Sequence, residues 1–441
     1  MKKIYSIILL LFLSHQLLCQ TIQMTGQMTY SRTNHQSQVL NNGKVLAFGG
    51  EAELLSTIVR QSCELYDPNS GTWSTQDFMN SPRTRFGSML LPNGNVFVFG
   101  GDTTGNSDYT ATCEIYDVTS NSWMYTESMH NAKGEFAFAI LNDGRLLVAA
   151  GISSTEVAEI YDPVSGHWSV VSSTFYNHGD ASFMLALSNN KVLLAAGLGV
   201  SSSQTAEIYD VTSDQWNPLP DMNYNHEYGS AILLNNGKAL IAGGSGTEAE
   251  LFDPSTNTFS ATASSNQLRR HCPMVLLNNS NPIAFGEGDI FNPSNTQCLE
   301  WYDVVSAQWM SQIYNIGGTQ NYTIHKILSD KILIIGGEFL FDASPYVYLV
   351  TDNTVGISEM LSDKFKIYPN PVNDKLFFDL SNIHSTDLKV TFYNILGKEV
   401  ASHRLNNSNP SLDISSFNKG VYQYILDTNN ELIYVGKIIK N

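Results

Sequence analysis

Three short landmarks recur in the chain at a spacing of 43 to 51 residues, and this repeat limits the fold more than any other feature. The first landmark is a pair of glycines, or a close substitute, at the end of an apolar run. The second is an aromatic residue followed by aspartate, and the third is a further aromatic residue six positions later. A period of this length is typical of solenoids and propellers. The six complete copies have their aspartates at Asp67, Asp117, Asp162, Asp210, Asp253 and Asp303.

The length of the repeat varies in one segment only. From the third landmark to the end of the next glycine pair the distance is 28 or 29 residues in every copy. From the glycine pair to the aspartate it ranges from 9 to 17 residues. All the variation in length therefore falls in one loop of each repeat. The long versions of this loop are residues 51–62, 102–112 and 288–297.

Within one repeat the pattern predicts four strands, which we call a to d. Strand a ends at an Asn-Gly turn, strand b is an apolar run such as 95–99, strand c ends at the aromatic-Asp pair, and strand d carries the third landmark. Strand b is apolar without alternation, as expected for a strand buried on both sheet faces. The turn chemistry and the many Tyr, Phe, Val and Ile residues place the chain in the all-β class.

In this order the landmarks resemble the kelch motif, and the resemblance covers residues 20–355. It implies a β-propeller of four-stranded blades, here seven-bladed. The seventh repeat has its glycine pair at Gly336 and Gly337 but lacks a strand d. Counting 28 residues back from Gly50 reaches Ile22, so the segment 20–28 is predicted to supply that strand and to close the ring.

Residues 1–19 have the layout of a cleavable export signal, with a basic start and an apolar stretch over residues 4–13. Gln20 is expected to begin the mature chain. Acylation of Cys19 is the alternative, although Leu18 is bulkier than the small residue that usually precedes such a site. No other run reaches the ~20 apolar residues that cross a bilayer, so no membrane span is expected.

The charge of the chain is uneven. The net charge is −17, yet residues 364–441 carry nine Lys and Arg against seven Asp and Glu, so the acidic excess lies in the propeller. Such a body disfavours nucleic acid and anionic membranes as partners.

Four cysteines remain after cleavage of the signal, and the predicted fold does not depend on disulfides. Cys63 and Cys113 occupy the same position in successive repeats, so they are interpreted as core residues of separate blades. Cys272 and Cys298 are the candidate pair for a bridge.

After a linker at 356–363, residues 364–441 form a second module with a different pattern. Four features in order, from a Tyr-Pro-Asn-Pro stretch to a basic end, resemble the type IX secretion sorting domain of Bacteroidota. Alternating apolar residues support a small β-sandwich. The resemblance implies export by the type IX machinery to give a secreted or surface-attached protein. Its signal residues are Tyr368, Pro369, Asn370, Pro371, Gly397, Lys398, Gly420 and Tyr422.

The variable b-to-c loops and the d-to-a connections are predicted to share one face of the propeller, because strands b and d end on the same side of an antiparallel blade. Variable loops on one face of a repeat fold are a usual place for binding. Polar residues of this face are therefore the candidate ligand-binding set: Arg32, His35, Arg83, Arg85, Asp102, His178, His226, Arg269, Arg270, His271 and Glu287.

Two interpretations of this set remain open. One is a polar pocket for an anionic or sugar-like ligand. The other is a structural role, in which the Arg and His side chains bind loop carbonyls and neighbouring carboxylates. No cofactor is expected, and no metal, because the histidines lack the short spacing of zinc or copper ligands.

The function predicted from these patterns is an exported recognition module for an extracellular glycan or protein. The alternative is an extracellular propeller enzyme acting on sugars, either a galactose-oxidase-like copper oxidase or a kelch-type sialic acid epimerase. The oxidase would need a linked Cys and Tyr with His ligands, of which His271-Cys272 is the nearest fragment. The epimerase would need an acid or base such as Glu51, Asp102 or Glu287, and the pattern singles out none of them.

Overall fold

The computed structural model describes residues 21–53, 57–152, 157–198, 203–271, 273–286, 297–314, 320–328, 330–339, 342–352, 366–368, 371–379, 388–393, 399–405, 411–428 and 431–440. The chain divides into two compact units between residues 353 and 354. The described residues of both units are strands, bridges, turns and loops, with no helix among them. The predicted signal peptide, its Cys19 alternative and the predicted linker lie outside the described residues.

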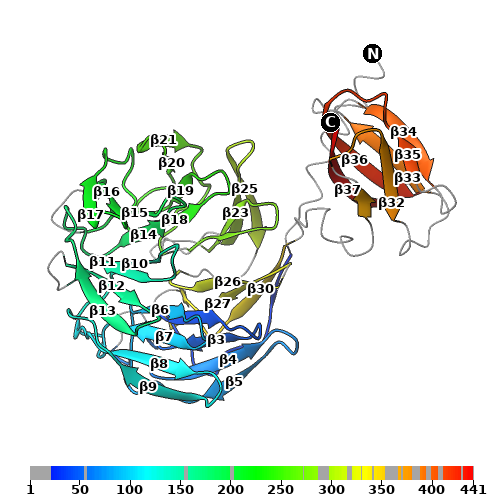
Figure 1. The fold of residues 1–441 in the computed structure, drawn as a ribbon. Coiled ribbons are helices and arrows are strands. Elements are labelled where there is room, and N and C mark those ends of the chain that lie inside the picture. The colour runs from blue at the N-terminus through cyan, green and yellow to red at the C-terminus, as the bar shows by residue number, and fades with distance from the viewer. Residues whose placement is uncertain are drawn as a thin grey trace. The chain divides into compact units, whose positions relative to one another are not determined.

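The first unit contains seven four-stranded antiparallel sheets in its described residues, and we number them as blades 1 to 7. Figure 1 shows the sheets following one another around a ring in chain order. The all-β propeller predicted from the repeat is therefore confirmed. Blades 1 to 3 consist of β2 (Gln36–Val39), β3 (Val45–Phe48), β4 (Cys63–Asp67), β5 (Thr72–Gln76); β6 (Gly87–Leu90), β7 (Val96–Phe99), β8 (Cys113–Asp117), β9 (Ser122–Thr126); and β10 (Ala137–Ile140), β11 (Leu146–Ala149), β12 (Ala158–Asp162), β13 (His167–Val171).

The later blades keep the same strand order. Blades 4 to 6 consist of β14 (Ser182–Ala186), β15 (Lys191–Ala196), β16 (Ala206–Asp210), β17 (Gln215–Pro218); β18 (Ser230–Leu233), β19 (Ala239–Ala242), β20 (Ala249–Asp253), β21 (Thr258–Thr262); and β22 (Val275–Leu276), β23 (Pro282–Phe285), β24 (Gln297–Asp303), β25 (Gln308–Tyr314). Blade 7 consists of β26 (Thr323–Leu328), β27 (Lys331–Ile335), β30 (Val347–Thr351) and β1 (Thr21–Met24), with a short hairpin of β28 (Glu338–Phe339) and β29 (Asp342–Ala343) before β30.

The apolar and aromatic residues of the repeat pattern pack inside each blade. Strand b is buried at every position in β3 and β7, as its unbroken apolar run predicts. The two aromatic landmarks face each other across strands c and d. Tyr66 pairs with Trp73 in register, and their ring centroids lie 5.2 Å apart. The same pair recurs in the later blades, so the aromatic landmarks pack the blade.

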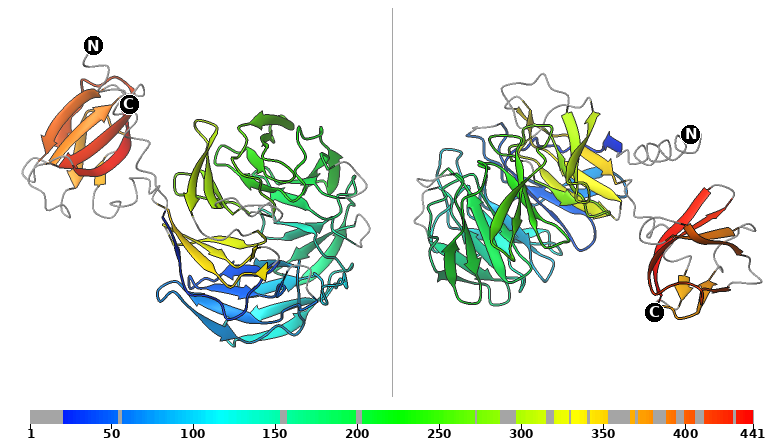
Figure 2. Two further views of the ribbon diagram at one scale, coloured as in Figure 1. Left: turned by 180° about the vertical axis from the view of Figure 1, so that it is seen from behind. Right: turned by 90° about the horizontal axis from the view of Figure 1, so that it is seen from above.

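The N-terminal strand closes the ring. β1 pairs antiparallel with β30, and Ile22 lies opposite Val350. Met28 is buried in the core between blades 7 and 1. Both views of Figure 2 and the view of Figure 1 place the yellow strands of blade 7 beside the blue strands of blade 1. The predicted closure by residues 20–28 is confirmed, and it pairs β30, which would otherwise be a sheet edge.

Two of the cysteines fill the core as predicted. Cys63 in blade 1 and Cys113 in blade 2 are buried and free. Burial raises the pKa of each thiol to about 12, so neither is a reactive thiolate. The candidate bridge between Cys272 and Cys298 lies outside the residues whose side chains are described.

The second unit has two sheets around one core. The smaller sheet contains β31 (Lys366–Tyr368), β32 (Lys375–Asp379) and β35 (Ser411–Asp413), and the larger contains β34 (Glu399–Leu405), β33 (Leu388–Tyr393), β36 (Gly420–Thr428) and β37 (Glu431–Lys440). Leu376 and Phe378 of one sheet share a core with Val390 and Phe392 of the other. The predicted β-sandwich is confirmed.

The predicted sorting residues are spread over this sandwich. Tyr368 is exposed and stacks on Phe377, and Tyr422 is buried. Pro371 is exposed and Gly420 begins β36. The others, Pro369, Asn370, Gly397 and Lys398, lie outside the described residues.

Candidate functional site at the axial mouth

A glutamate stands three residues before the aspartate of the second landmark in six blades, and all six are buried. In blade 1 the Glu64 carboxylate accepts hydrogen bonds from the backbone N–H groups of Thr29 (2.7 Å) and Tyr30 (3.1 Å). These two residues belong to the d-to-a connection that leads into the blade. The carboxylate therefore fixes the connection to strand c. The six residues are Glu64, Glu114, Glu159, Glu207, Glu250 and Glu300.

Five of the predicted site residues are the basic partners of these glutamates. Each is buried, the three arginines form ion pairs with their glutamates, and the two histidines contact theirs through Nε2. In blade 3 the buried Lys133 takes the equivalent place and donates to the carbonyl of Val157. The five pairs are Arg32–Glu64 at 3.0 Å, Arg83–Glu114 at 3.0 Å, His178–Glu207 at 3.0 Å, His226–Glu250 at 3.1 Å and Arg269–Glu300 at 2.7 Å. These five side chains therefore make structural contacts, which is one of the two interpretations that the sequence left open.

The choice between arginine and histidine follows the length of the b-to-c loop. Arg83 donates to Gly100 O (2.9 Å) at the start of the long loop and to Thr112 O (2.8 Å) at its end. His178 has only two ring nitrogens, and they face Ala196 O (2.6 Å) and Glu207. A guanidinium has five donors and can hold both ends of a long loop as well as the carboxylate. Blades 1, 2 and 6, which have the long loops, carry the arginines.

A ring of seven residues surrounds the propeller axis at the start of the strands a. Each has a left-handed backbone, with φ between 48° and 62°. Backbone hydrogen bonds join neighbouring members, from Arg85 N to Asn34 O (3.2 Å), from Glu135 N to Arg85 O (3.2 Å) and from His271 N to Tyr228 O (2.8 Å). We call this ring, together with the charged residues near it, the axial mouth. These charged residues are Glu51, Asp102, Asp180, Glu227, Arg270 and Glu338. The members of the ring are Asn34, Arg85, Glu135, Ala181, Tyr228, His271 and Asn321.

Arg85 lies between two carboxylates of the axial mouth. Its guanidinium is 3.3 Å from Glu51 and 3.2 Å from Glu135. Glu51 follows the glycine pair of blade 1, and its Oε1 also accepts from Thr84 Oγ1 of blade 2 at 2.7 Å. One cation therefore serves two carboxylates. Burial, followed by the charges of Asp180 and others, raises the pKa of Glu135 although Arg85 opposes the shift.

The other predicted residues of this face have separate roles. Asp102 accepts four backbone N–H groups of its own loop, including Gly105 (3.0 Å) and Ser107 (2.7 Å), so it shapes that loop. Arg270 lies over the ring of Tyr228 at 5.8 Å. His35 is buried, with Nε2 3.3 Å from Thr323 Oγ1. Glu287 lies outside the described residues.

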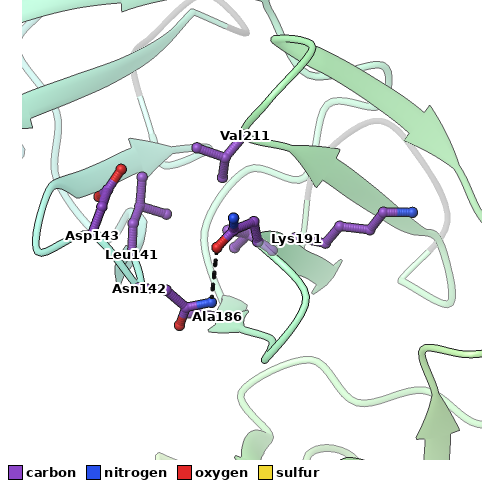
Figure 3. A pocket seen from close by; sticks show the side chains of 8 residues that line it. Leu141, Asn142, Asp143, Ala186, Lys191 and Val211 are labelled. Carbon is purple, nitrogen blue, oxygen red and sulfur yellow. Dashed lines mark hydrogen bonds between the residues drawn. The ribbon is translucent and has the colours of Figure 1, made fainter.

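A small hollow lies between blades 3 and 4, at the opposite end of the blades, among the a-to-b and c-to-d turns. Its volume is about 210 Å³, including solvent at its open side. In Figure 3 the Asn142 amide crosses its edge and donates to Asn190 Oδ1 at 3.3 Å. Leu141, Ala186 and Val211 line the remainder. It contains none of the predicted site residues.

The comparisons with known proteins agree with both units. Residues 366–441 match the secretion system C-terminal sorting domain, and residues 83–130 and 185–223 match the kelch motif. The chain carries kelch motifs and a secretion sorting domain. A search of curated protein sequences finds no match. The sorting domain indicates export through type IX secretion, which gives a secreted or cell-surface protein, and it implies interaction with that machinery.

One similar solved structure is a fungal alcohol oxidase of the AA5 family, in complex with copper. It is 13% identical, has a TM-score of 0.61, and the alignment covers 97% of this chain and 100% of that one. At this identity the likeness concerns the fold alone. The described residues of this chain contain no group of three His, Cys, Asp or Glu placed to hold a metal ion. No copper chemistry is assigned to them.

In the described part of the chain, no helix is long and apolar enough to cross a membrane.

The sequence interpretation did not anticipate the buried glutamates or the axial ring. The glutamates did carry a signal, because each stands three residues before the landmark aspartate in six copies. The ring had only a positional signal. Its members precede the last buried apolar residue of strand a by six positions, as Asn34 precedes Leu40, but they share no side-chain chemistry.

Proposed function

We propose that the exported kelch propeller is a recognition module that binds an extracellular glycan or protein at its axial mouth. The observation that carries this proposal is the contrast between the two sets of residues on one face. The buried Glu–basic pairs repeat from blade to blade and form a scaffold. The ring residues share one backbone conformation but carry six different side chains over the seven blades, with Asn in blades 1 and 7.

Such a mouth has the attributes of a binding surface. Tyr228, Glu135 and Asn321 are partly exposed, and His271 is exposed. The left-handed backbone and the hydrogen bonds between blades hold these side chains in place before a ligand arrives. Preorganised polar and aromatic groups reduce the entropy cost of binding. The b-to-c loops that vary in length lie on the same face, which favours specificity.

The experiment is capture of the mature protein on an array of glycans and immobilised peptides. Tyr228→Ala should abolish capture of any ligand that the native protein retains, because it removes the largest ring side chain. The matched control is Tyr125→Ala, an exposed tyrosine on β9 of blade 2. Equal loss in both variants, or capture unaffected by Tyr228→Ala, would rule out the mouth as the site.

The enzymatic alternative is tested on the same preparation. The copper content and the turnover of galactose and sialic acid are measured alongside the array. Stoichiometric copper with oxidation of galactose, or epimerisation of sialic acid, would replace the recognition proposal.

A further inference from the structure

The axial mouth is acidic, although its sequence reads as basic. The five arginines and histidines that the sequence places on this face are buried against glutamates inside the blades. The described residues around the axis then contribute more carboxylates than cations. The cations are Arg85 and Arg270, and the carboxylates are Glu51, Asp102, Glu135, Asp180, Glu227 and Glu338.

Glu51 is the acid that lacks a full set of partners. Its side chain is 0% exposed. Its Oε1 accepts from Thr84 and lies beside Arg85, whereas Oε2 has no hydrogen-bond partner in the described structure. A buried carboxylate oxygen without a donor is costly, and native proteins usually satisfy it with a protein group, water or a ligand. The described protein groups therefore leave part of the Glu51 charge uncompensated.

Two further acids are placed around the same axis with more exposure. Asp180 and Glu227 are each intermediate in exposure. Burial raises the pKa of Asp180, and the nearby charge of Glu227 raises it further while Arg85 opposes the shift. Like charges held together in this way stabilise an added cation and repel an anion.

An aromatic wall completes the surroundings. The rings of Tyr228 and His271 lie 4.5 Å apart, and Arg270 already lies over the Tyr228 ring. The face of a tyrosine ring attracts a cation when the two are close. Because Arg270 already lies over the Tyr228 ring, this ring forms an aromatic border of the mouth, and the carboxylates are the acceptors for an organic cation.

We propose that the axial mouth binds a ligand through an organic cation, a primary ammonium or guanidinium group, which donates to the partly exposed Glu135 and Asp180 beside Tyr228, with the buried charge of Glu51 behind them. This inference rests on the proposed function and names the chemistry of its ligand. The group can come from a lysine or arginine side chain of a peptide or from an amino sugar. Anionic ligands are disfavoured at this site.

The test is calorimetric titration of the mature protein at low ionic strength with matched charged and neutral probes. The charged probes are Nα-acetyl-lysine amide, Nα-acetyl-arginine amide and glucosamine oligomers. The neutral probes are Nα-acetyl-norleucine amide, Nα-acetyl-citrulline amide and N-acetylglucosamine oligomers. At least one charged probe should bind about tenfold or more tightly than its neutral partner, and binding should weaken with added salt. The peptide and sugar arms identify the source of the cation.

Variants of two acidic residues test whether the cation of the ligand binds at the axial mouth. Glu51→Gln and Asp180→Asn should each weaken the charged probe by about tenfold. The matched control is Asp143→Asn, an exposed carboxylate in the a-to-b turn of blade 3, which should change nothing. Thermal melting checks that each variant is folded, and Asp180→Asn keeps the test decisive if Glu51→Gln is not.

Equal binding of charged and neutral probes, or no effect of Asp180→Asn, would overturn the cation inference. The proposed function is tested separately. A neutral glycan or peptide captured on the array and lost in Tyr228→Ala would leave the recognition module standing while removing the cation. An array with no ligand sensitive to Tyr228→Ala would remove both.

Discussion

The buried ion pair of blade 2 is stable because the carboxylate is satisfied from several sides. Glu114 accepts from the backbone of Asn80 (2.7 Å) and Ser81 (3.1 Å) and from the Arg83 guanidinium. Desolvation of two charges is expensive, and only good geometry with further hydrogen bonds offsets it. The pair thus contributes to the shape of the d-to-a connection, which positions the axial ring.

Removing one partner should be far more harmful than removing a surface pair. Arg83→Ala leaves Glu114 buried without its cation and should lower the free energy of unfolding by about 3–5 kcal/mol. The control is Arg145→Ala, whose partner Asp143 is 48% exposed, with an expected cost of about 0–1 kcal/mol. Urea denaturation of both variants checks this. Equal, small losses would show that the buried pair is not part of the scaffold.

His35 predicts a loss of stability in acid. Burial and then the Arg32 charge lower the pKa of this imidazole to about 3. In the unfolded chain it titrates near pH ~6.5. As the pH falls from about 6.5 towards 3, the unfolded state takes up a proton that the native state refuses, so stability falls by at most about 1.4 kcal/mol per pH unit from this group.

The phenylalanine found at this repeat position in blade 2, Phe86, suggests the variant His35→Phe. Its free energy of unfolding, measured from pH 7 to pH 4, should decline less steeply than that of the native protein. Parallel curves would show that His35 does not titrate as its burial requires.

At the scale of elements, the N-terminal segment that closes the ring makes a close backbone contact with blade 1 at Gly26. A Cβ at Gly26 would lie 2.1 Å from the Gly71 carbonyl oxygen of blade 1, to which Gly26 N donates at 3.0 Å. Trp73 Nε1 donates back to Gly26 O at 2.8 Å. The landmark tryptophan of blade 1 therefore holds the N-terminal segment in place.

Gly26→Ala should weaken the closure. Forcing the two backbones apart should cost about 1–3 kcal/mol, as overpacking does elsewhere. Gln27→Ala, at the exposed neighbouring position, is the control and should be nearly neutral. Thermal unfolding measures both variants. An unchanged midpoint in Gly26→Ala would show that the close contact at Gly26 does not stabilise the ring closure.

The sequence allows the framework to be predicted more fully than the site. The constant spacing of the landmarks in six copies predicted the strands. The seventh copy lacks its aromatic strand, and the same count predicted that residues 20–28 supply it. Counting within a repeat needs no tertiary information. The partners of Arg32 and His178 could not be read the same way, because each lies about 30 residues away across a loop of varying length. Arg85 and Asp102 were placed on the correct face, but the acidic balance there appears only once the other basic residues are paired.

At the scale of the whole molecule, the two units have different roles. The sorting domain indicates export, and the propeller presents one face with a varied polar ring. The chain carries a net charge of −17, and a net charge far from zero favours solubility.

The most direct measurement is a crystal structure of the mature protein with the ligand captured on the array. Ligand atoms are expected within hydrogen-bond distance of Glu135 or Asp180 and in contact with the Tyr228 ring. A ligand seated instead on the turns near Asn142, or on the outer strands d, would contradict it.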